Sequence, residues 1–493
     1  MDKLLTGTSA TVRRSRKNAL RLSGIDLYGA IWYIAGPIVI VAYCLPTALK
    51  ISDAAHAVLI LLYVTVCAVG VIDGFVSGAR IVQITYFGFS LVWSGIPVVY
   101  QLASDTPAWR DYSLYSYRGV VTQALLIHLL SACAVLLAIR LARLWRRPIF
   151  VAPVRRLRRP IMPASVLYVG IAIAITPVVL SVSGGISAMF TSRDTLKDEL
   201  RNSGVIAADS SQAMLGFLKI LPGSLALSAA ILVIAHMQMK DRARGRRAWW
   251  KSEGAILTLG LSLGLCVLYL NPLTNTRFVS AGAVICLLLA AIRPRGRKGG
   301  LILGAFIVLG FQALYPLANM FRSSESLRAG PQFDPRGFSG PDYDGFQQIV
   351  NTLLYTQDYG HTYGAHLLSG VLFFVPRSIW TGKMYPASLD IAEARGYDFT
   401  NLSEPLHAEL YLEFGLVPML ALMAIVGVII SRIDIGWLGS PGSALAIIAP
   451  YVAVAQYGLL RGPFGSLAPV YLSTMILLVL GLALTQRSRT GRS

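Results

Sequence analysis

The residues best suited to chemistry lie in a short polar run, residues 403–415, beside an apolar stretch. Glu409 and Glu413 are four apart and share a helix face, whereas His407 lies about 160° from Glu409 round a helix. Carboxylates at a membrane edge are costly unless they are paired or functional. We expect one glutamate to accept a proton and the other to pair with an arginine. Further candidate general bases are His407 and Glu404.

Four arginines stand at the ends of apolar stretches, on one side of the predicted membrane. Each could simply anchor a helix end at the headgroup level. Arginine also binds phosphate through paired hydrogen bonds and keeps its charge, so four together favour an anion site at the depth of lipid phosphates. The four residues are Arg277, Arg322, Arg377 and Arg461.

Other features of this region have ordinary explanations. Charges typical of a solvated loop surface are those of Arg328, Arg336, Asp342 and Asp344. His361 and His366 are five apart and lack the spacing of a zinc site, so no metal is expected. The sequence has neither a phosphate-binding glycine loop nor a nucleophile elbow. The expected chemistry therefore uses no metal or other cofactor.

The elements that position these residues must lie in a lipid bilayer, because the 493-residue chain is 55% hydrophobic and only 14% charged. A spanning helix needs about 20 apolar residues, and about twelve stretches qualify. We predict an all-α, polytopic membrane helix bundle in one domain, 1–493. The stretches are centred near Ile40, Leu62, Val92, Leu130, Ile173, Ile231, Leu263, Val284, Ile307, Met419, Ile448 and Leu477.

The longest hydrophilic segment, 322–407, lies between the ninth and tenth stretches and is predicted to be extracytoplasmic. Within it, 366–375 is apolar but short and is followed by Pro376 and Arg377, which indicates a re-entrant or interfacial segment. Lysine and arginine collect in alternate loops and at both ends, so both termini are expected in the cytoplasm. The net charge of +20 then points to anionic lipid headgroups rather than nucleic acid.

Three segments resemble bacterial oligosaccharide repeat-unit polymerases of the Wzy type, which make O-antigen and exopolysaccharide. The first, 370–383, contains Pro-Arg-Ser-Ile-Trp-Thr-Gly-Lys; the second, 404–415, ends in Glu-Phe-Gly; the third is Leu-Arg-Gly at 460–462. The specific match covers about the last quarter of the chain. The rest resembles the family in hydropathy and in the number of spans.

The resemblance implies a GT-C-like glycosyltransferase of the bacterial cytoplasmic membrane, which polymerises undecaprenyl-diphosphate-linked oligosaccharide repeat units on the outer face. It implies that the four arginines named above, with Lys383 of the first segment, bind the lipid diphosphate. A chain-length regulator and a flippase are further candidate partners. Two alternatives stay open: a ligase that uses the same lipid carrier, and a secondary transporter or flippase. A transporter predicts charges at mid-membrane, whereas the span centres look uncharged.

Overall fold

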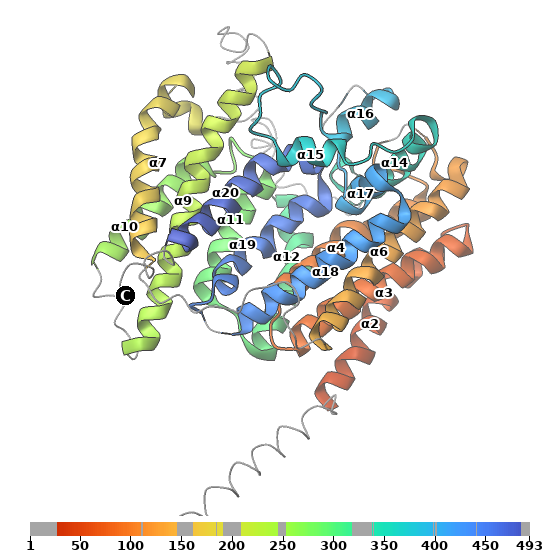
Figure 1. The fold of residues 1–493 in the computed structure, drawn as a ribbon. Helices are drawn as coiled ribbons and strands as arrows, with labels where there is room; N and C mark the ends of the chain where they lie inside the picture. Colours follow the sequence, from red (N-terminus) through yellow and green to blue (C-terminus); the bar gives the residue numbers. More distant parts are fainter. Residues whose placement is uncertain are drawn as a thin grey trace, which may run out of the picture.

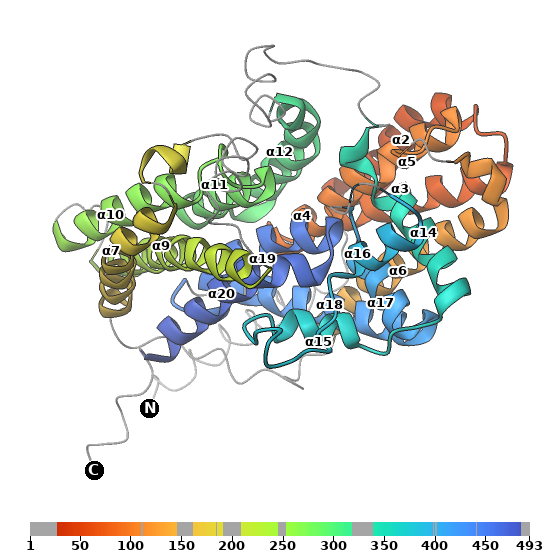
Figure 2. The same cartoon turned by 90° about the horizontal axis from the view of Figure 1, so that it is seen from above.

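The described residues form one bundle of helices, shown from the side in Figure 1 and from above in Figure 2. This computed structural model describes residues 27–109, 112–144, 161–183, 185–190, 209–244, 253–317, 338, 340–397, 399, 402–439 and 441–484. Within these ranges every regular element is helical, which confirms the predicted all-α class. One cluster of buried apolar side chains runs through most of the helices.

Every predicted apolar stretch coincides with a helix. Among the described residues, nine helical segments are long and apolar enough to cross a membrane, as a multi-pass membrane protein requires. Two others, α10 and α11, have 17 and 16 residues, and the count of twelve crossings stays a prediction. The helices are α2 (Leu27–Ala48), α3 (Ala54–Val76), α4 (Ile81–Ser90) with α5 (Ile96–Ser104), α6 (Arg118–Leu144), α7 (Met162–Ser183), α9 (Asp209–Arg244), α10 (Glu253–Tyr269), α11 (Arg277–Ile292), α12 (Gly296–Leu317), α18 (Leu416–Leu438), α19 (Ala444–Arg461) and α20 (Phe464–Leu484).

The outward faces of the bundle are apolar, as expected for helices that lipid surrounds. On α7, for example, Val166 and Val178 are 51% and 55% exposed, and on α2 Val39 is 66% exposed. A water-soluble protein rarely leaves so large an apolar surface uncovered. Lipid is therefore the solvent that these faces fit.

The centre of the bundle is the segment formed by α4 and α5, whose membrane-length window is entirely buried. A turn of π-helix, Leu91–Gly95, joins the two helices, and such turns are frequent at functional sites. Beside this segment, α6 and α18 cross closely because of Gly427, where an added Cβ would lie 2.5 Å from the carbonyl oxygen of Val135. Small residues at helix crossings allow such backbone contact in membranes.

Two buried carboxylates of the predicted spans, Asp434 and Asp73, lie near the same end of the bundle. Asp434 of α18 accepts hydrogen bonds of 2.9 Å from the backbone nitrogens of Val82 and Gln83, and so caps the start of α4. Asp73 of α3 pairs with Arg143 of α6 at 2.7 Å. These contacts fix four helices to one another at that end.

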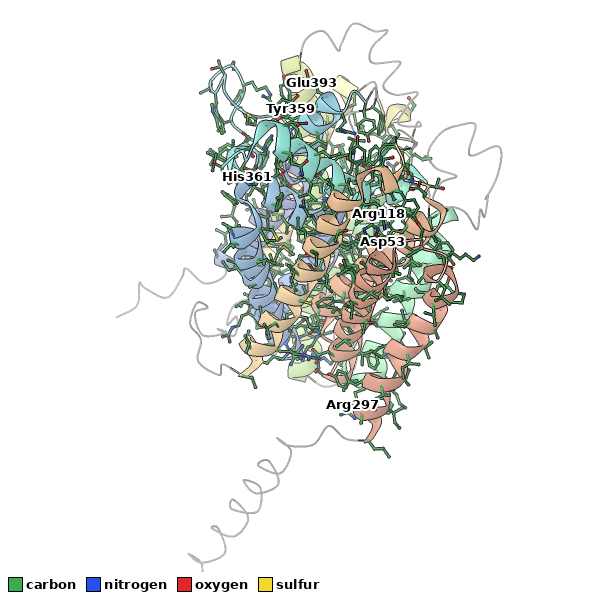
Figure 3. The ribbon with its side chains drawn as sticks, turned by 90° about the vertical axis from the view of Figure 1, so that its right-hand side faces the viewer. Asp53, Arg118, Arg297, Tyr359, His361 and Glu393 are labelled. Carbon is green, nitrogen blue, oxygen red and sulfur yellow. The ribbon has the colours of Figure 1, made fainter. Side chains whose placement is uncertain are left out.

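Six labelled residues from the described part of the chain lie toward opposite ends of the bundle (Figure 3). Tyr359, His361 and Glu393, from the predicted outer loop, lie at one end, together with Asp53 and Arg118 (Figure 3). Arg297, predicted to lie on the inner side, is at the opposite end (Figure 3). Which end faces the cytoplasm stays a prediction.

The described part of the long loop is itself helical and caps one end of the bundle (Figure 1). Its helices are α14 (Gly345–Tyr359), α15 (Ala365–Val371), α16 (Ala387–Ala394) and α17 (Leu406–Phe414). The seven residues of α15 are too few to cross a bilayer, in agreement with the predicted short segment. Its flank exposes Phe374 and Ile379, at 61% and 77%, an apolar surface that suits an interfacial position.

The polar run expected to open the tenth span instead forms a helix of its own, α17. The reason is Gly415, whose φ of +78° ends α17 before α18 begins. Only glycine adopts this backbone conformation readily. The Glu-Phe-Gly sequence therefore marks a break between two helices.

Candidate active site

The polar residues singled out in the sequence meet where α15, α16 and α17 pack against the turn between α19 and α20. Gly370 of α15 allows this contact, because an added Cβ would lie 2.7 Å from the ring of Phe464 and 3.2 Å from the Cα of Gly465. The backbone nitrogen of Glu404 donates to the carbonyl oxygen of Arg461 at 2.8 Å. These contacts bring the segments 370–386, 404–413 and 461–465 together.

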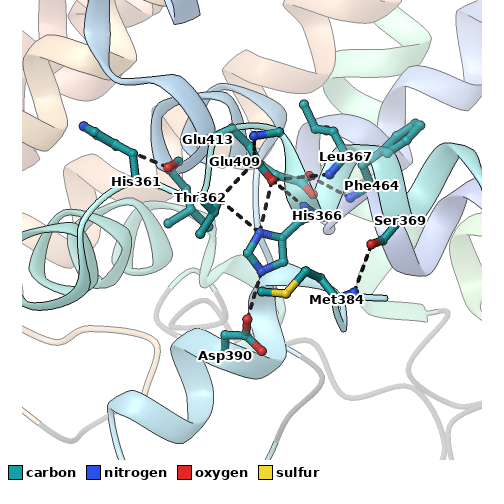
Figure 4. A network of polar contacts seen from close by, with 12 residues as sticks. His361, Thr362, His366, Leu367, Ser369, Met384, Asp390, Glu409, Glu413 and Phe464 are labelled. Carbon is teal, nitrogen blue, oxygen red and sulfur yellow. Dashed lines mark hydrogen bonds and ion pairs between the residues drawn. The ribbon is translucent and has the colours of Figure 1, made fainter. Parts of the chain in front are cut away.

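Glu413 is a fully buried carboxylate whose oxygens are occupied by donors from the start of α15 (Figure 4). It accepts hydrogen bonds from the backbone nitrogens of Gly364, His366 and Leu367 and from the hydroxyl of Thr362. Burial alone would raise the pKa of Glu413, but the hydrogen bond and the charge of His366 lower it. Glu413 is thus an ionised structural group, and its charged partner is a histidine rather than the expected arginine.

His366 joins α17 to α16. Its Nδ1 lies 3.1 Å from Oε1 of Glu413, and its Nε2 lies 2.9 Å from Oδ2 of Asp390 (Figure 4). Burial would lower the pKa of His366, but hydrogen bonds to the two carboxylates and their charges outweigh it and raise the pKa to about 9. The group Glu413–His366–Asp390, hereafter the clasp, therefore carries a positively charged imidazole at neutral pH.

Glu409 has the properties of a general base. Its side chain is fully buried; Oε2 accepts a hydrogen bond of 2.7 Å from the backbone nitrogen of Phe464, at the start of α20 (Figure 4). Oε1 has no hydrogen-bond partner in the described part of the chain. Burial raises the pKa of Glu409 to about 7, partly offset by the Phe464 hydrogen bond. A carboxylate with a free oxygen and a pKa near the working pH suits proton transfer.

Glu404 is a second carboxyl group close to Glu409. Its Oε1 accepts a hydrogen bond of 2.9 Å from Thr352 of α14, while Oε2 is buried without a described partner. Burial raises the pKa of Glu404 well above its usual value, and the charge of Glu409 raises it further. Burial therefore favours the protonated form of Glu404, in which Oε2 can donate a hydrogen bond.

His407 points away from this group, as the helix periodicity predicted. Its Nε2 lies 2.9 Å from Nδ1 of His128 in α6, and the His128 ring stacks on Tyr63 at 3.8 Å between ring centres. Burial lowers the pKa of His407 to about 4. The two rings connect α17 to the bundle, and His407 lies apart from Glu409.

Arg461, at the end of α19, lies over two aromatic rings. Its guanidinium carbon is 4.7 Å from the ring centre of Phe278 and 5.4 Å from that of Trp93, within the range of cation–π attraction. Nη2 lies 3.8 Å from Oδ1 of Asp342. The Nε hydrogen is buried without a described partner. An anion could therefore use donors of Arg461 that no described protein group occupies.

Arg377 and Lys383 are held within their own loop. The ammonium of Lys383 donates to the carbonyl oxygens of Leu372, Phe373 and Val375 at 2.8–3.1 Å, which occupies its three hydrogens. Arg377 donates to the carbonyl oxygens of Lys383 and Met384 and stacks on Tyr385. In this conformation the two residues stabilise the loop that packs on the α19–α20 turn.

Of the other two arginines, Arg277 is the first residue of α11 and Arg322 lies outside the described residues. Arg328 and Arg336 also lie outside them. The interpretation of Asp344 as a solvated charge is wrong: it is 1% exposed and accepts hydrogen bonds from Trp109 and from the backbone of Ser403. Asp342, also expected in solvent, faces Arg461.

Sequence reasoning missed Asp390, Thr352 and His366 as members of this site. Each acts through a residue at least 24 positions away in the chain. One signal was available for His366, because Thr-Tyr-Gly-Ala-His at 362–366 places a histidine and a hydroxyl beside glycine at a helix start. Among the described residues, no group of three histidine, cysteine or acidic side chains could hold a metal ion.

No family model, no curated protein and no solved structure matches this chain. The site therefore has to be interpreted from its own geometry.

Proposed function

We propose that this chain is a membrane glycosyltransferase that polymerises undecaprenyl-diphosphate-linked oligosaccharide repeat units. The observation that carries the proposal is Glu409, a buried carboxylate with a pKa of about 7 and one oxygen that has no described partner. Its other oxygen accepts a hydrogen bond from Phe464, in the turn between α19 and α20 that Arg461 begins. A base and a cation at the same turn suit sugar transfer, because the base can accept the proton of the acceptor hydroxyl and the cation can stabilise the phosphate leaving group.

In the proposed reaction, a hydroxyl oxygen of one repeat unit attacks the anomeric carbon of another. The bond between that carbon and the diphosphate oxygen breaks, and the hydroxyl proton passes to Oε1 of Glu409. The leaving diphosphate keeps the bonding electrons, and the charge of Arg461 stabilises it. Burial raises the pKa of the neighbouring Glu404 and so disfavours a second negative charge beside Glu409. A positioned base contributes about 10²–10⁴-fold in rate.

The clasp and the 372–385 loop act as supports in this proposal. Glu413 and His366 fix the start of α15, and Lys383 and Arg377 fix the loop that follows. On either side of this loop, Gly370 and Pro386 pack against the α19–α20 turn. We extend the proposal to twelve crossings, with both termini in the cytoplasm of a bacterial cell and the capped end facing outward.

The ligase alternative would use the same residues in the same roles. The transporter alternative receives less support, because the ion pairs of the predicted spans lie at their ends, as with Asp73 and Arg143, rather than at mid-membrane. The lipid-linked species that accumulate when the protein is removed from its cell test the proposal. Single repeat units support a polymerase, and long lipid-linked chains would indicate a ligase. The absence of both would contradict the proposed function.

A further inference from the structure

A narrow, mainly apolar cleft with a cavity volume of about 60 Å³ lies between α9, α11, α19 and α20. This space suits one short stretch of a slender chain rather than a whole drug-sized ligand. Each helix contributes residues spaced three or four apart, so the cleft follows one face of every helix. On α11 the lining extends from Phe278 to Cys286, which is about 12 Å along the helix axis. The α11 positions are Phe278, Val279, Gly282, Ala283 and Cys286.

One end of this cleft reaches the candidate active site through Phe278. The ring of Phe278 lines the cleft and also lies under the guanidinium of Arg461, 4.7 Å away. Arg461 has a buried Nε hydrogen without a described partner, and its one described carboxylate neighbour, Asp342, is 3.8 Å away. An apolar cleft thus ends at a cation whose donors are incompletely used.

This arrangement has the chemistry of an amphiphile: a long apolar chain attached to an anionic head. Water is a poor occupant because apolar walls offer it few hydrogen-bond partners. In a bilayer, an apolar chain gains little free energy when it moves from lipid into an apolar cleft. The shape of the cleft and the head group therefore decide which lipid binds. A phosphate head suits arginine, because the planar guanidinium can form paired hydrogen bonds to it.

We infer that this cleft holds the proximal part of an isoprenoid chain whose diphosphate contacts Arg461. The cleft and the arginine carry the inference of a phosphate-bearing lipid, while the choice of an isoprenoid diphosphate rests on the proposed function. The remainder of a longer chain stays in the bilayer. The chain therefore approaches from the α9–α11 side, and the sugar lies toward Glu409.

The test measures equilibrium binding to the purified full-length protein in detergent. The probes are geranylgeranyl diphosphate, geranylgeraniol and inorganic pyrophosphate, with phosphatidylglycerol as competitor. Ala283→Phe fills the cleft and should weaken geranylgeranyl diphosphate binding at least about tenfold, leaving pyrophosphate binding unchanged. Ala281→Phe, the same substitution at an exposed position of α11, is the matched control and should bind as the unmodified protein does.

Arg461→Gln should weaken both phosphate-bearing probes and leave geranylgeraniol unaffected. If Ala283→Phe fails to fold, Ala455→Phe blocks the same cleft from α19. Unchanged geranylgeranyl diphosphate binding by a folded cleft variant would overturn the inference. Equal displacement by phosphatidylglycerol would overturn it as well, because the cleft would then be a general lipid site.

The inference and the proposed function fail in different ways. If the cleft variants lose lipid binding but the unmodified protein transfers no sugar, the cleft is supported and only the proposed function is refuted. Sugar transfer that depends on Glu409 but is unaffected by Ala283→Phe would refute the cleft alone.

Discussion

Glu409 and Glu413 lie on one face of α17, yet replacement of each by glutamine should change stability in opposite directions. Glu409 is buried as a carboxylate with one occupied oxygen, and its pKa is raised from 4.5 to about 7. Because the folded state holds this proton more tightly, the carboxylate reduces stability as the pH rises from 4.5 through 7. The shift in pKa corresponds to a loss of about 3 kcal/mol in the free energy of unfolding above pH 7. Glu409→Gln removes this penalty, since the amide oxygen can still accept the Phe464 hydrogen bond.

Glu413→Gln should instead destabilise the protein. Only one atom of the glutamine amide can accept hydrogen bonds, whereas both oxygens of Glu413 accept them from backbone nitrogens. The substitution also leaves the His366 imidazole without one of its two counter-charges. Breaking a buried charged pair costs roughly 3–5 kcal/mol. The lowered pKa of Glu413 means that its contribution is present above pH 4.5 and is lost as the pH falls through the folded pKa.

The assay is thermal unfolding of both variants in detergent at pH 5 and pH 8, together with sugar transfer from a lipid-linked repeat unit. Glu409→Gln should unfold at a higher temperature than the unmodified protein at pH 8, with a smaller difference at pH 5, and turn over about 10²–10⁴-fold more slowly. The unmodified rate should rise with pH to a plateau above about 7. A Glu409→Gln variant that is as unstable as Glu413→Gln at pH 8 would refute these assignments.

Four further predictions test the surroundings of Glu409. The unmodified protein should lose stability between pH 6.5 and 9, because protonated His366, with a pKa raised to about 9, stabilises the fold fully only below pH 6.5. His366→Gln should lack this pH dependence, and a pH series of unfolding temperatures measures it. Lys383→Met should expose the 372–385 loop to limited proteolysis, whereas a Lys383 that only binds phosphate would leave cleavage unchanged. Arg461→Lys should cut transfer severely despite the retained charge, because an ammonium cannot reproduce a planar fork; full activity would make Arg461 a membrane anchor. Cysteine at the exposed position Ser378 should react with an impermeant thiol reagent in intact cells, and cysteine at Lys298 should not; the reverse pattern would invert the topology.

The positions of the helices could be predicted from the sequence because hydropathy over about 20 residues depends on local composition alone. Ile40 and Leu477, for example, lie well inside α2 and α20. The break at Gly415 was harder to foresee, since the same glycine could have continued a helix at a cost of about 1 kcal/mol. In the structure its φ is +78°, and a Cβ added there would lie 3.2 Å from Nε2 of His361.

The partners of the polar residues could not be predicted for a different reason. Glu413 and His366 are 47 positions apart, and nothing in either segment specifies the other. Lys383 shows the opposite difficulty: its partners are 8–11 residues away, but they are backbone carbonyl oxygens, which carry no sequence signature. Asp344 was taken for a surface charge because it lies in a long hydrophilic loop segment, whereas Asp344, Gln347 and Gln348 are all buried.

The most direct test of the central claim is transfer by the purified protein in liposomes that contain an undecaprenyl-diphosphate-linked repeat unit and a chelator of divalent metals. We expect lipid-linked products that grow by whole repeat units, with release of one undecaprenyl diphosphate per unit added. We also expect that Glu409→Gln binds the substrate but forms these products far more slowly. Movement of the intact lipid between leaflets without any longer product, equally in both proteins, would contradict the central claim.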